Sequence, residues 1–243
     1  MATLIYDDYV EEVTDASFNL LKKFLEMVTE KGIQPIIIGG WAVEAFKKSK
    51  GSKDIDIVIR GSDVDKLLSN DFFEEGGMDE VQQGWPLRHE KKIFVNGAEK
   101  TILCDIFNSE IPRDDYEKQG IKLHWNLIPQ FQESRKIRDL PVLVPKREIL
   151  IITKIVAAVD RLARYTRIGD EKLKSKIWKD YYDIAVLINM EQELDKEFLK
   201  KYINEVNLTS HMNKFLFGYK QDYNGILDEV GISLEKIETV LTT

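Results

Sequence analysis

Residues 36–60, "IIIGGWAVEAFKKSKGSKDIDIVIR", decide how this chain folds. An apolar run ends in Gly39 and Gly40, and a short segment with helical spacing follows. A second apolar run then begins, and it carries Asp54 and Asp56. This order predicts a buried strand, a short helix and a second strand.

The surrounding sequence predicts two domains. An amphipathic helix is expected over 17–32 and a short helix over 62–70, on either side of the first unit. Further strand candidates lie at 91–95, at 101–107, around Ile137 and at 141–144. From Lys146 onward the apolar spacing is helical. We therefore predict an α+β domain over 1–145, with its sheet flanked by helices, and a helical domain over 146–243.

Three carboxylates are the first candidates for chemistry. Side chains alternate across a strand, so Asp54 and Asp56 should project from one face while the isoleucines beside them enter the opposite layer. Neighbouring like charges favour a shared proton or a bound cation. Asp105, in the apolar run "TILCDIFNSE", is a third carboxylate that would be costly to bury alone. Carboxylates on neighbouring strands can hold paired Mg²⁺ ions for phosphoryl or nucleotidyl transfer, which predicts a metal site here.

The two glycines predict a phosphate-binding turn. Between a strand and a helix, Gly39 and Gly40 would let the backbone approach a triphosphate at the N-terminus of the helix that begins near Trp41. A Gly-Gly pair is also common in plain turns, and an Asp-x-Asp pair is also common at exposed strand edges. The combination of both patterns is more specific than either alone, and it favours the functional interpretation.

Composition excludes several classes of protein. The 243 residues and 43% hydrophobic content fit one large globular domain or two modest ones. The sequence contains no run of about 18 apolar residues. Its start, "MATLIYDDYVEEVTD", is acidic where a signal peptide would be basic. We therefore expect a cytoplasmic protein without a membrane partner. Cys104 is the only cysteine, and the three histidines are scattered, so any metal should be held by oxygen.

The net charge of −7 is unevenly distributed. Residues 1–120 carry 15 basic and 24 acidic side chains, whereas residues 131–180 carry 13 and 7. The basic segment is either a set of solvated helix faces or a surface that meets phosphates. The acidic segment would suit a cationic small molecule. Charge alone leaves these alternatives open.

The glycine turn and the carboxylates resemble the DNA polymerase beta-like nucleotidyltransferase superfamily. Its pattern is Gly-Gly or Gly-Ser, then Asp-x-Asp, then a carboxylate on a further strand, which here reads "GGW", "KDIDIV" and "LCDIF". Lys50 and Ser52 fall where many members carry Arg and Thr or Ser. The resemblance implies a nucleotidyltransferase-type mixed sheet. Lysine at position 50 lacks the bidentate fork with which arginine meets phosphate.

The second half of the chain resembles the AbiEii-type toxins. In that group one helix carries Lys and then Arg, and a later helix carries Lys/Arg-Asp-x-x-Asp-Leu. The segments "VPKREILIITKIVAAVDR" and "KDYYDIAVL" place Lys154, Arg161, Lys179, Asp180 and Asp183 at these positions. Seven residues apart on one helix, Lys154 and Arg161 should share a face. A structural ion-pair network between the two helices is the alternative interpretation.

The motifs and the two resemblances together predict a nucleotidyltransferase that depends on Mg²⁺ or Mn²⁺ and moves an NMP from an NTP such as ATP to a hydroxyl. Asp54, Asp56 and Asp105 would bind the metal, and Asp105 would draw the proton from the acceptor. The resemblances imply nucleotide contacts at Gly39, Gly40, Lys50, Ser52, Lys154, Arg161 and Asp180.

The acceptor and partners are open to several interpretations. We expect the 3′ end of an RNA such as tRNA, with Trp178, Tyr181 and Tyr182 offered for base stacking. The AbiEii resemblance also implies an antitoxin partner. One alternative is an aminoglycoside- or lincosamide-type antibiotic nucleotidyltransferase, because "GGWAVEA" resembles the start of such enzymes. The other is a non-catalytic nucleotide-binding module.

Overall fold

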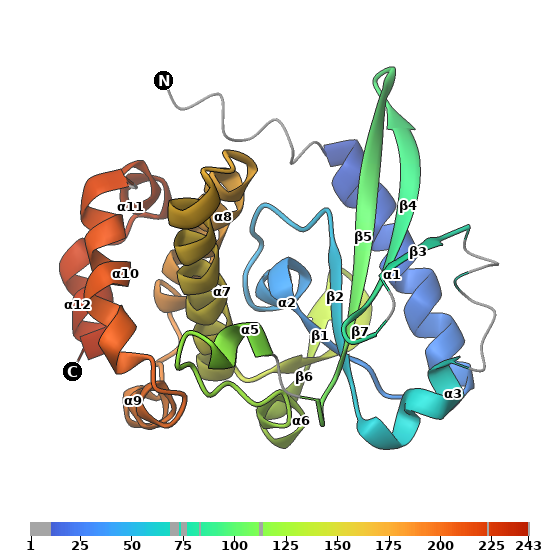
Figure 1. Cartoon of the computed structure of the whole chain (residues 1–243), viewed down its shortest axis with the longest axis horizontal. Coiled ribbons are helices and arrows are strands. Elements are labelled where there is room, and N and C mark those ends of the chain that lie inside the picture. Colours follow the sequence, from blue (N-terminus) through green and yellow to red (C-terminus); the bar gives the residue numbers. More distant parts are fainter. Residues whose placement is uncertain are drawn as a thin grey trace. The chain divides into compact units, whose positions relative to one another are not determined.

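A computed structural model of the chain describes residues 11–68, 73, 77–82, 84–111, 114–222 and 224–242 (Figure 1). The chain divides into two compact units. The first, called here the sheet unit, contains the described residues of 6–112 and 124–146. The second, called here the helical unit, contains those of 113–123 and 147–243. The assignment of catalysis to 1–145 stays a prediction.

The described part of the sheet unit is built on a seven-stranded sheet in the order β3-β4-β5-β2-β1-β7-β6. The strands are β1 (Ile36–Ile38), β2 (Ile55–Ile59), β3 (Asp79–Gln82), β4 (Leu87–Val95), β5 (Ala98–Asn108), β6 (Gln132–Ile137) and β7 (Leu140–Pro145). β2 is parallel to β5 and β1 is parallel to β7, while the other neighbouring pairs are antiparallel. The predicted mixed sheet of an α+β fold is confirmed.

Two strands are longer than predicted, and one was missed. β4 begins at Leu87 and β5 begins at Ala98, because the two form a hairpin that adds pairs beyond their apolar cores. Asn96 and Gly97 connect them with φ of 52° and 77°, as a tight hairpin turn requires. All four residues of β3 are exposed, so this edge strand lacks the apolar alternation that predicts a strand.

The central strands fix the register of the sheet. Ile36 and Ile37 of β1, and Ile55, Ile57 and Ile59 of β2, have no exposed surface. Because side chains alternate along a strand, a slip of one residue would bring every one of these side chains to the wrong face. Burial of the isoleucines therefore also determines which face carries the aspartates between and before them.

The helices of the sheet unit are α1 (Glu11–Glu30), α2 (Gly39–Phe46), α3 (Val64–Leu68) and α6 (Leu127–Gln130). α1 begins earlier than the predicted helix over 17–32, and residues 69–70 of the helix predicted after β2 lie outside the described residues. Phe24 of α1 packs against Phe73, whose ring stacks on His89 of β4 at 3.6 Å between centroids. α1 therefore covers the face of the sheet that carries His89.

The helical unit consists, in its described part, of the short helix α5 and six further helices. They are α5 (Asp114–Glu117), α7 (Arg147–Ile168), α8 (Lys172–Ile188), α9 (Lys196–Glu205), α10 (Thr209–Asp222), α11 (Asn224–Val230) and α12 (Leu234–Thr242). α7 packs against α8, and Gly169 ends α7 with φ of 68°. Among the described helices, none has the length and apolar character needed to cross a membrane.

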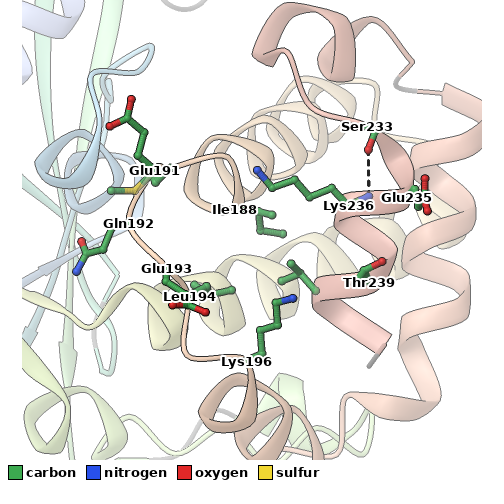
Figure 2. Close-up of a pocket in the computed structure, with 12 residues that line it drawn as sticks. Ile188, Glu191, Gln192, Glu193, Leu194, Lys196, Ser233, Glu235, Lys236 and Thr239 are labelled. Atoms are coloured by element: carbon green, nitrogen blue, oxygen red, sulfur yellow. Dashed lines mark hydrogen bonds between the residues drawn. The ribbon is translucent and has the colours of Figure 1, made fainter.

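A cavity of about 440 Å³ opens in the helical unit between the end of α8, the segment that follows it and α12 (Figure 2). Ile188 and Leu194 give it an apolar wall, and Glu193, Lys196 and Lys236 add charges. The sequence-predicted site residues are not among those that line it.

Candidate active site

The parallel pairing of β2 with β5 brings two predicted catalytic residues together. The Cα atom of Asp56 is the register partner of the Cα atom of Asp105, so both side chains project from the same face. Asp54 lies one residue before β2, and its Oδ1 accepts a hydrogen bond of 3.3 Å from the backbone N–H of Leu103 in β5. The three carboxylates therefore gather at the start of β2.

The glycine turn lies directly beside this group. β1 pairs with β2 so that Ile38 faces Asp56, and the chain turns into α2 at the next residue, Gly39. A Cβ atom on Gly39 would lie 2.2 Å from Oδ2 of Asp56, and the φ of Gly39 is 68°. Both facts require glycine at this position. At Gly40 a Cβ would lie 2.9 Å from the Ser52 side chain.

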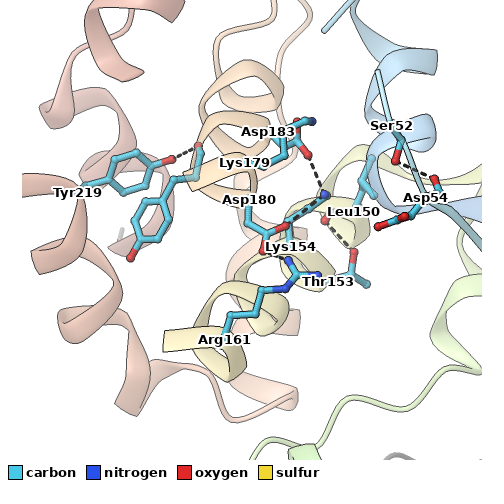
Figure 3. A network of polar contacts seen from close by, with 11 residues as sticks. Ser52, Asp54, Leu150, Thr153, Lys154, Arg161, Lys179, Asp180, Asp183 and Tyr219 are labelled. Atoms are coloured by element: carbon cyan, nitrogen blue, oxygen red, sulfur yellow. Dashed lines mark hydrogen bonds and ion pairs between the residues drawn. The ribbon is translucent and has the colours of Figure 1, made fainter. Parts of the chain in front are cut away.

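The segment before the aspartate pair is held by its own side chains. Ser52 is buried, and its Oγ donates a hydrogen bond of 2.8 Å to the backbone oxygen of Asp54 (Figure 3). This bond orders the approach to β2. Lys50 lies two residues earlier and is half-buried. Nucleotide contacts by Lys50 and Ser52 stay predictions.

Sequence reasoning missed Arg88, which contacts the third carboxylate. Its Nε donates to Oδ1 of Asp105 at 2.6 Å, and its Nη2 donates to Oδ2 at 2.6 Å. This bond raises the pKa of Arg88, and the charges of Asp105, Asp56 and Asp54 add to the effect. Arg88 lies before the predicted strand at 91–95, so only the pairing of β4 with β5 reveals its position.

The donor set suits a divalent cation of the magnesium type. The candidate ligands are carboxylate oxygens, which Mg²⁺ prefers, and Asp56 and Asp105 share one face on adjacent strands. In the part of the chain that the structure describes, no group of three or more His, Cys, Asp or Glu side chains is arranged to hold a metal ion. Both oxygens of Asp105 are engaged by Arg88. The metal role of the three aspartates stays a prediction.

Cys104 has no catalytic role in this arrangement. Its side chain is buried on the opposite face of β5 from Asp105. Burial raises the pKa of the thiol, and the charges of Asp105 and Asp56 raise it further. The thiol therefore stays protonated, as the sequence interpretation of a core residue implied.

The helical unit holds the second group of predicted residues (Figure 3). Lys154 of α7 lies 3.3 Å from Oδ1 of Asp180 and 2.7 Å from Oδ2 of Asp183, both of α8. Arg161 of α7 contacts the other oxygen of Asp180, and Lys179 contacts the other oxygen of Asp183. The predicted pairing between the two helices is thus present as an ion-pair network, which we call the α7–α8 network.

The α7–α8 network is buried. Asp183 has 0% and Asp180 1% of its surface exposed. Burial lowers the pKa of Lys154, but the charges of Asp183 and Asp180 outweigh burial, and the net effect is a raised pKa. Burial dominates at Lys179, where the pKa is lowered. The arrangement stabilises the packing of α7 on α8 when all its members are present.

The aromatic residues of α8 do not form a stacking platform. Tyr181 is fully buried, packs against the rings of Phe215 and Tyr219, and donates a hydrogen bond of 2.7 Å to the backbone oxygen of Phe215. Trp178 is 8% exposed and stacks on Tyr182. The expectation that these rings meet an RNA base is wrong for Tyr181 and Trp178, because both belong to the core.

The predicted site residues thus form two groups in two units. The sheet-unit group is Gly39, Gly40, Ser52, Asp54, Asp56 and Asp105. The helical-unit group is Lys154, Arg161, Lys179, Asp180 and Asp183. A glycine turn, an aspartate pair and a carboxylate on the neighbouring strand together define the class of nucleotidyltransferase-like proteins.

Comparison with known proteins gives the family. The family model described as "Nucleotidyl transferase AbiEii toxin, Type IV TA system" matches residues 51–238, which is more than half of the chain. The chain belongs to this family.

Solved structures similar to this chain include two with nucleotidyltransferase names. One is an antigenic nucleotidyltransferase-like protein from Paracoccidioides brasiliensis, with 17% identity, 84% of this chain and 92% of that chain covered, and a TM-score of 0.43. The other is the antibiotic-resistance factor ANT(2″)-Ia, with 16% identity, 79% and 96% covered, and a TM-score of 0.38. No curated protein matches the chain.

Proposed function

We propose that this protein is a metal-dependent nucleotidyltransferase that moves an NMP from an NTP to a hydroxyl acceptor. The observation that carries the proposal is the register pairing of Asp56 with Asp105, beside a glycine turn that packs against Asp56. Membership of a nucleotidyl transferase family supports the same reaction.

The carboxylates and the turn would divide the work. Asp54, Asp56 and Asp105 would hold Mg²⁺ or Mn²⁺, and the cation would neutralise phosphate charge. The backbone N–H groups at the start of α2, from Gly39 and Gly40, would bind the phosphates of an NTP such as ATP. These groups can orient the α-phosphate for in-line attack.

The transfer step itself follows from the chemistry of the acceptor. The acceptor oxygen forms a bond to the α-phosphorus while the bond from that phosphorus to the bridging oxygen of pyrophosphate breaks. The acceptor proton passes to a carboxylate, for which Asp105 is the candidate base. Pyrophosphate leaves with the electron pair of the broken bond.

The α7–α8 network supplies positive charge for the nucleotide. Its five side chains carry three positive charges, from Lys154, Arg161 and Lys179, and two negative charges, from Asp180 and Asp183. This excess supports the proposal that Lys154 and Arg161 meet triphosphate, with Asp180 orienting both cations. Lys50 and Ser52 are proposed as further nucleotide contacts ahead of the aspartate pair.

The acceptor we propose is the 3′ end of an RNA such as tRNA. Basic side chains are exposed where α7 ends and α8 begins, namely Arg164, Arg167, Lys172 and Lys174. Such a cluster would bind a phosphate backbone in a manner that weakens with salt. The family is a component of type IV toxin–antitoxin systems, which supports a protein antitoxin as a further partner.

Incorporation of labelled nucleotide tests the reaction and the acceptor. Each of the four NTPs is offered with Mg²⁺ and either total tRNA or an aminoglycoside, and Asp56→Asn serves as the inactive control. Label in tRNA supports the proposal. Label only in the aminoglycoside would establish an antibiotic-type enzyme, and no label in either acceptor, with no nucleotide binding by calorimetry, would contradict nucleotidyl transfer.

A charge reversal tests the surface. Arg164→Glu should reduce use of tRNA at moderate salt while NTP affinity is kept. Lys201→Glu, at an exposed lysine of α9 that faces Glu205, is the matched control and should leave acceptor use unchanged. Equal effects of the two reversals would remove the α7–α8 surface from the proposal.

A further inference from the structure

Arg88 is an internal cation at the centre of the candidate active site. It lies on β4 as the register partner of Asp105, and its two donors engage the two oxygens of that carboxylate at 2.6 Å each. Its pKa is raised first by this bond and then by the charges of Asp105, Asp56 and Asp54. All three predicted metal ligands therefore act on one guanidinium.

This position places Arg88 in competition with a bound cation. A carboxylate that accepts both donors of an arginine fork has its best lone pairs occupied. A divalent ion that used Asp105 would also lie close to a fixed positive charge, which repels it. Metal binding and the Arg88–Asp105 bond are therefore alternatives at the same two oxygens.

The guanidinium can leave the carboxylate without unfolding the sheet. The Arg88 side chain is 36% exposed, whereas that of Asp105 is 14% exposed. β4 and β5 pair continuously from Leu87 to Val95, so the hairpin does not depend on one ion pair. An exposed arginine can move to another rotamer while the backbone pairing is kept.

We propose that Arg88 is the counter-ion of the active-site carboxylates, and that a divalent cation must displace it from Asp105 in order to bind. The inference rests on the proposed function, in which the three aspartates hold the metal. It assigns Arg88 a positioning role: it balances three neighbouring negative charges in the metal-free protein and sets how tightly the metal binds.

Metal affinity separates this role from a purely structural one. The full chain is titrated with Mn²⁺ alone, and free Mn²⁺ is followed by electron paramagnetic resonance. Arg88→Gln should bind Mn²⁺ about tenfold more tightly than wild type, since a charged hydrogen-bonded competitor at a partly exposed site is lost. Arg88→Lys, which keeps the charge without the fork, should fall between the two.

A matched control lies on the same strand. Lys92 is four residues from Arg88, so it projects from the same face of β4, and it forms only an exposed ion pair of 3.7 Å with Glu99. Lys92→Gln should bind Mn²⁺ as wild type does. Thermal unfolding gives a second readout: Arg88→Gln should melt lower than wild type without metal and should gain more from added Mn²⁺.

The outcomes separate this inference from the proposed function. Equal or weaker Mn²⁺ binding by Arg88→Gln, with wild-type binding that Asp56→Asn abolishes, would overturn the role of Arg88 and leave the metal site intact. No Mn²⁺ binding by wild type or by Arg88→Gln would overturn the metal assignment and this inference with it. Tighter binding by Arg88→Gln that Asp56→Asn removes supports both.

Discussion

Replacing Asp183 by asparagine should strongly destabilise the protein. Asp183 lies on α8 with no exposed surface, and its two oxygens contact two different lysines, Lys154 of α7 and Lys179 of α8. Asparagine has nearly the same volume, so packing is kept and only the charge is removed. The change therefore tests the electrostatics of the α7–α8 network.

The magnitude follows from the charges that remain. Without Asp183, the cations Lys154, Arg161 and Lys179 are left with Asp180 alone. Breaking a buried ion pair by removing one partner costs about 3–5 kcal/mol. Lys179 already has a pKa lowered by burial, so it can lose its proton and relieve part of this cost. We therefore expect a loss of about 3 kcal/mol, near the lower end of that range.

Urea unfolding at neutral pH, followed by circular dichroism, measures this loss. The double variant Asp183→Asn/Lys179→Met should be more stable than Asp183→Asn alone, because one stranded cation is removed with the carboxylate. Asp228→Asn, at an exposed position of α11 in the same unit, is the control and should change stability by less than about 0.5 kcal/mol.

Two results would refute the reasoning. If Asp183→Asn is within about 0.5 kcal/mol of wild type, the buried carboxylate does not balance the two lysines. If the double variant is less stable than the single one, Lys179 is held in place by something other than Asp183. Either result would also weaken the case that the excess charge of the α7–α8 network is available to a nucleotide.

Three further changes test the sheet unit. Gly39→Ala should cost about 1–2 kcal/mol in left-handed strain and abolish transfer, because the new Cβ meets Asp56; urea unfolding and a transfer assay measure the two effects. His89 has a pKa lowered from 6.5 by burial, so its stabilising effect is complete above pH 6.5 and is lost as the pH falls through the lower folded-state pKa; unfolding at pH 7 and pH 5 should show this loss in wild type and not in His89→Gln. Ser52→Ala removes the hydrogen bond to the Asp54 backbone and should cost about 1 kcal/mol while slowing transfer, and an unchanged rate would show that this bond does not position the site.

The sequence was sufficient for the central part of the fold because its periodicities are strong. The isoleucine runs at β1 and β2 are fully buried, and buried strands read as continuous apolar segments. The same holds for α7 and α8, whose long apolar faces are typical of packed helices. β3 could not be predicted, because a strand with every residue exposed is defined by its hydrogen bonds to β4 and carries no apolar pattern.

The predicted site residues were found to different degrees for a physical reason. Lys154 and Arg161 are local to one helix, and spacing alone predicts that they share a face. The partners Asp180 and Asp183 were expected to meet them because their own spacing also matches one helical face. Contact between the helices then required only that α7 pack against α8, which a short connection at Gly169 favours.

Arg88 illustrates what sequence spacing cannot supply. Seventeen residues separate it from Asp105, and the contact exists only because the Asn96-Gly97 turn sets the register in which Arg88 faces Asp105. A register shifted by one residue would place His89 opposite Asp105 and turn the arginine to the face covered by α1. The tight turn therefore determines the electrostatics of a site far from it along the hairpin. Shortening or lengthening that turn should alter metal affinity even though no ligand is changed.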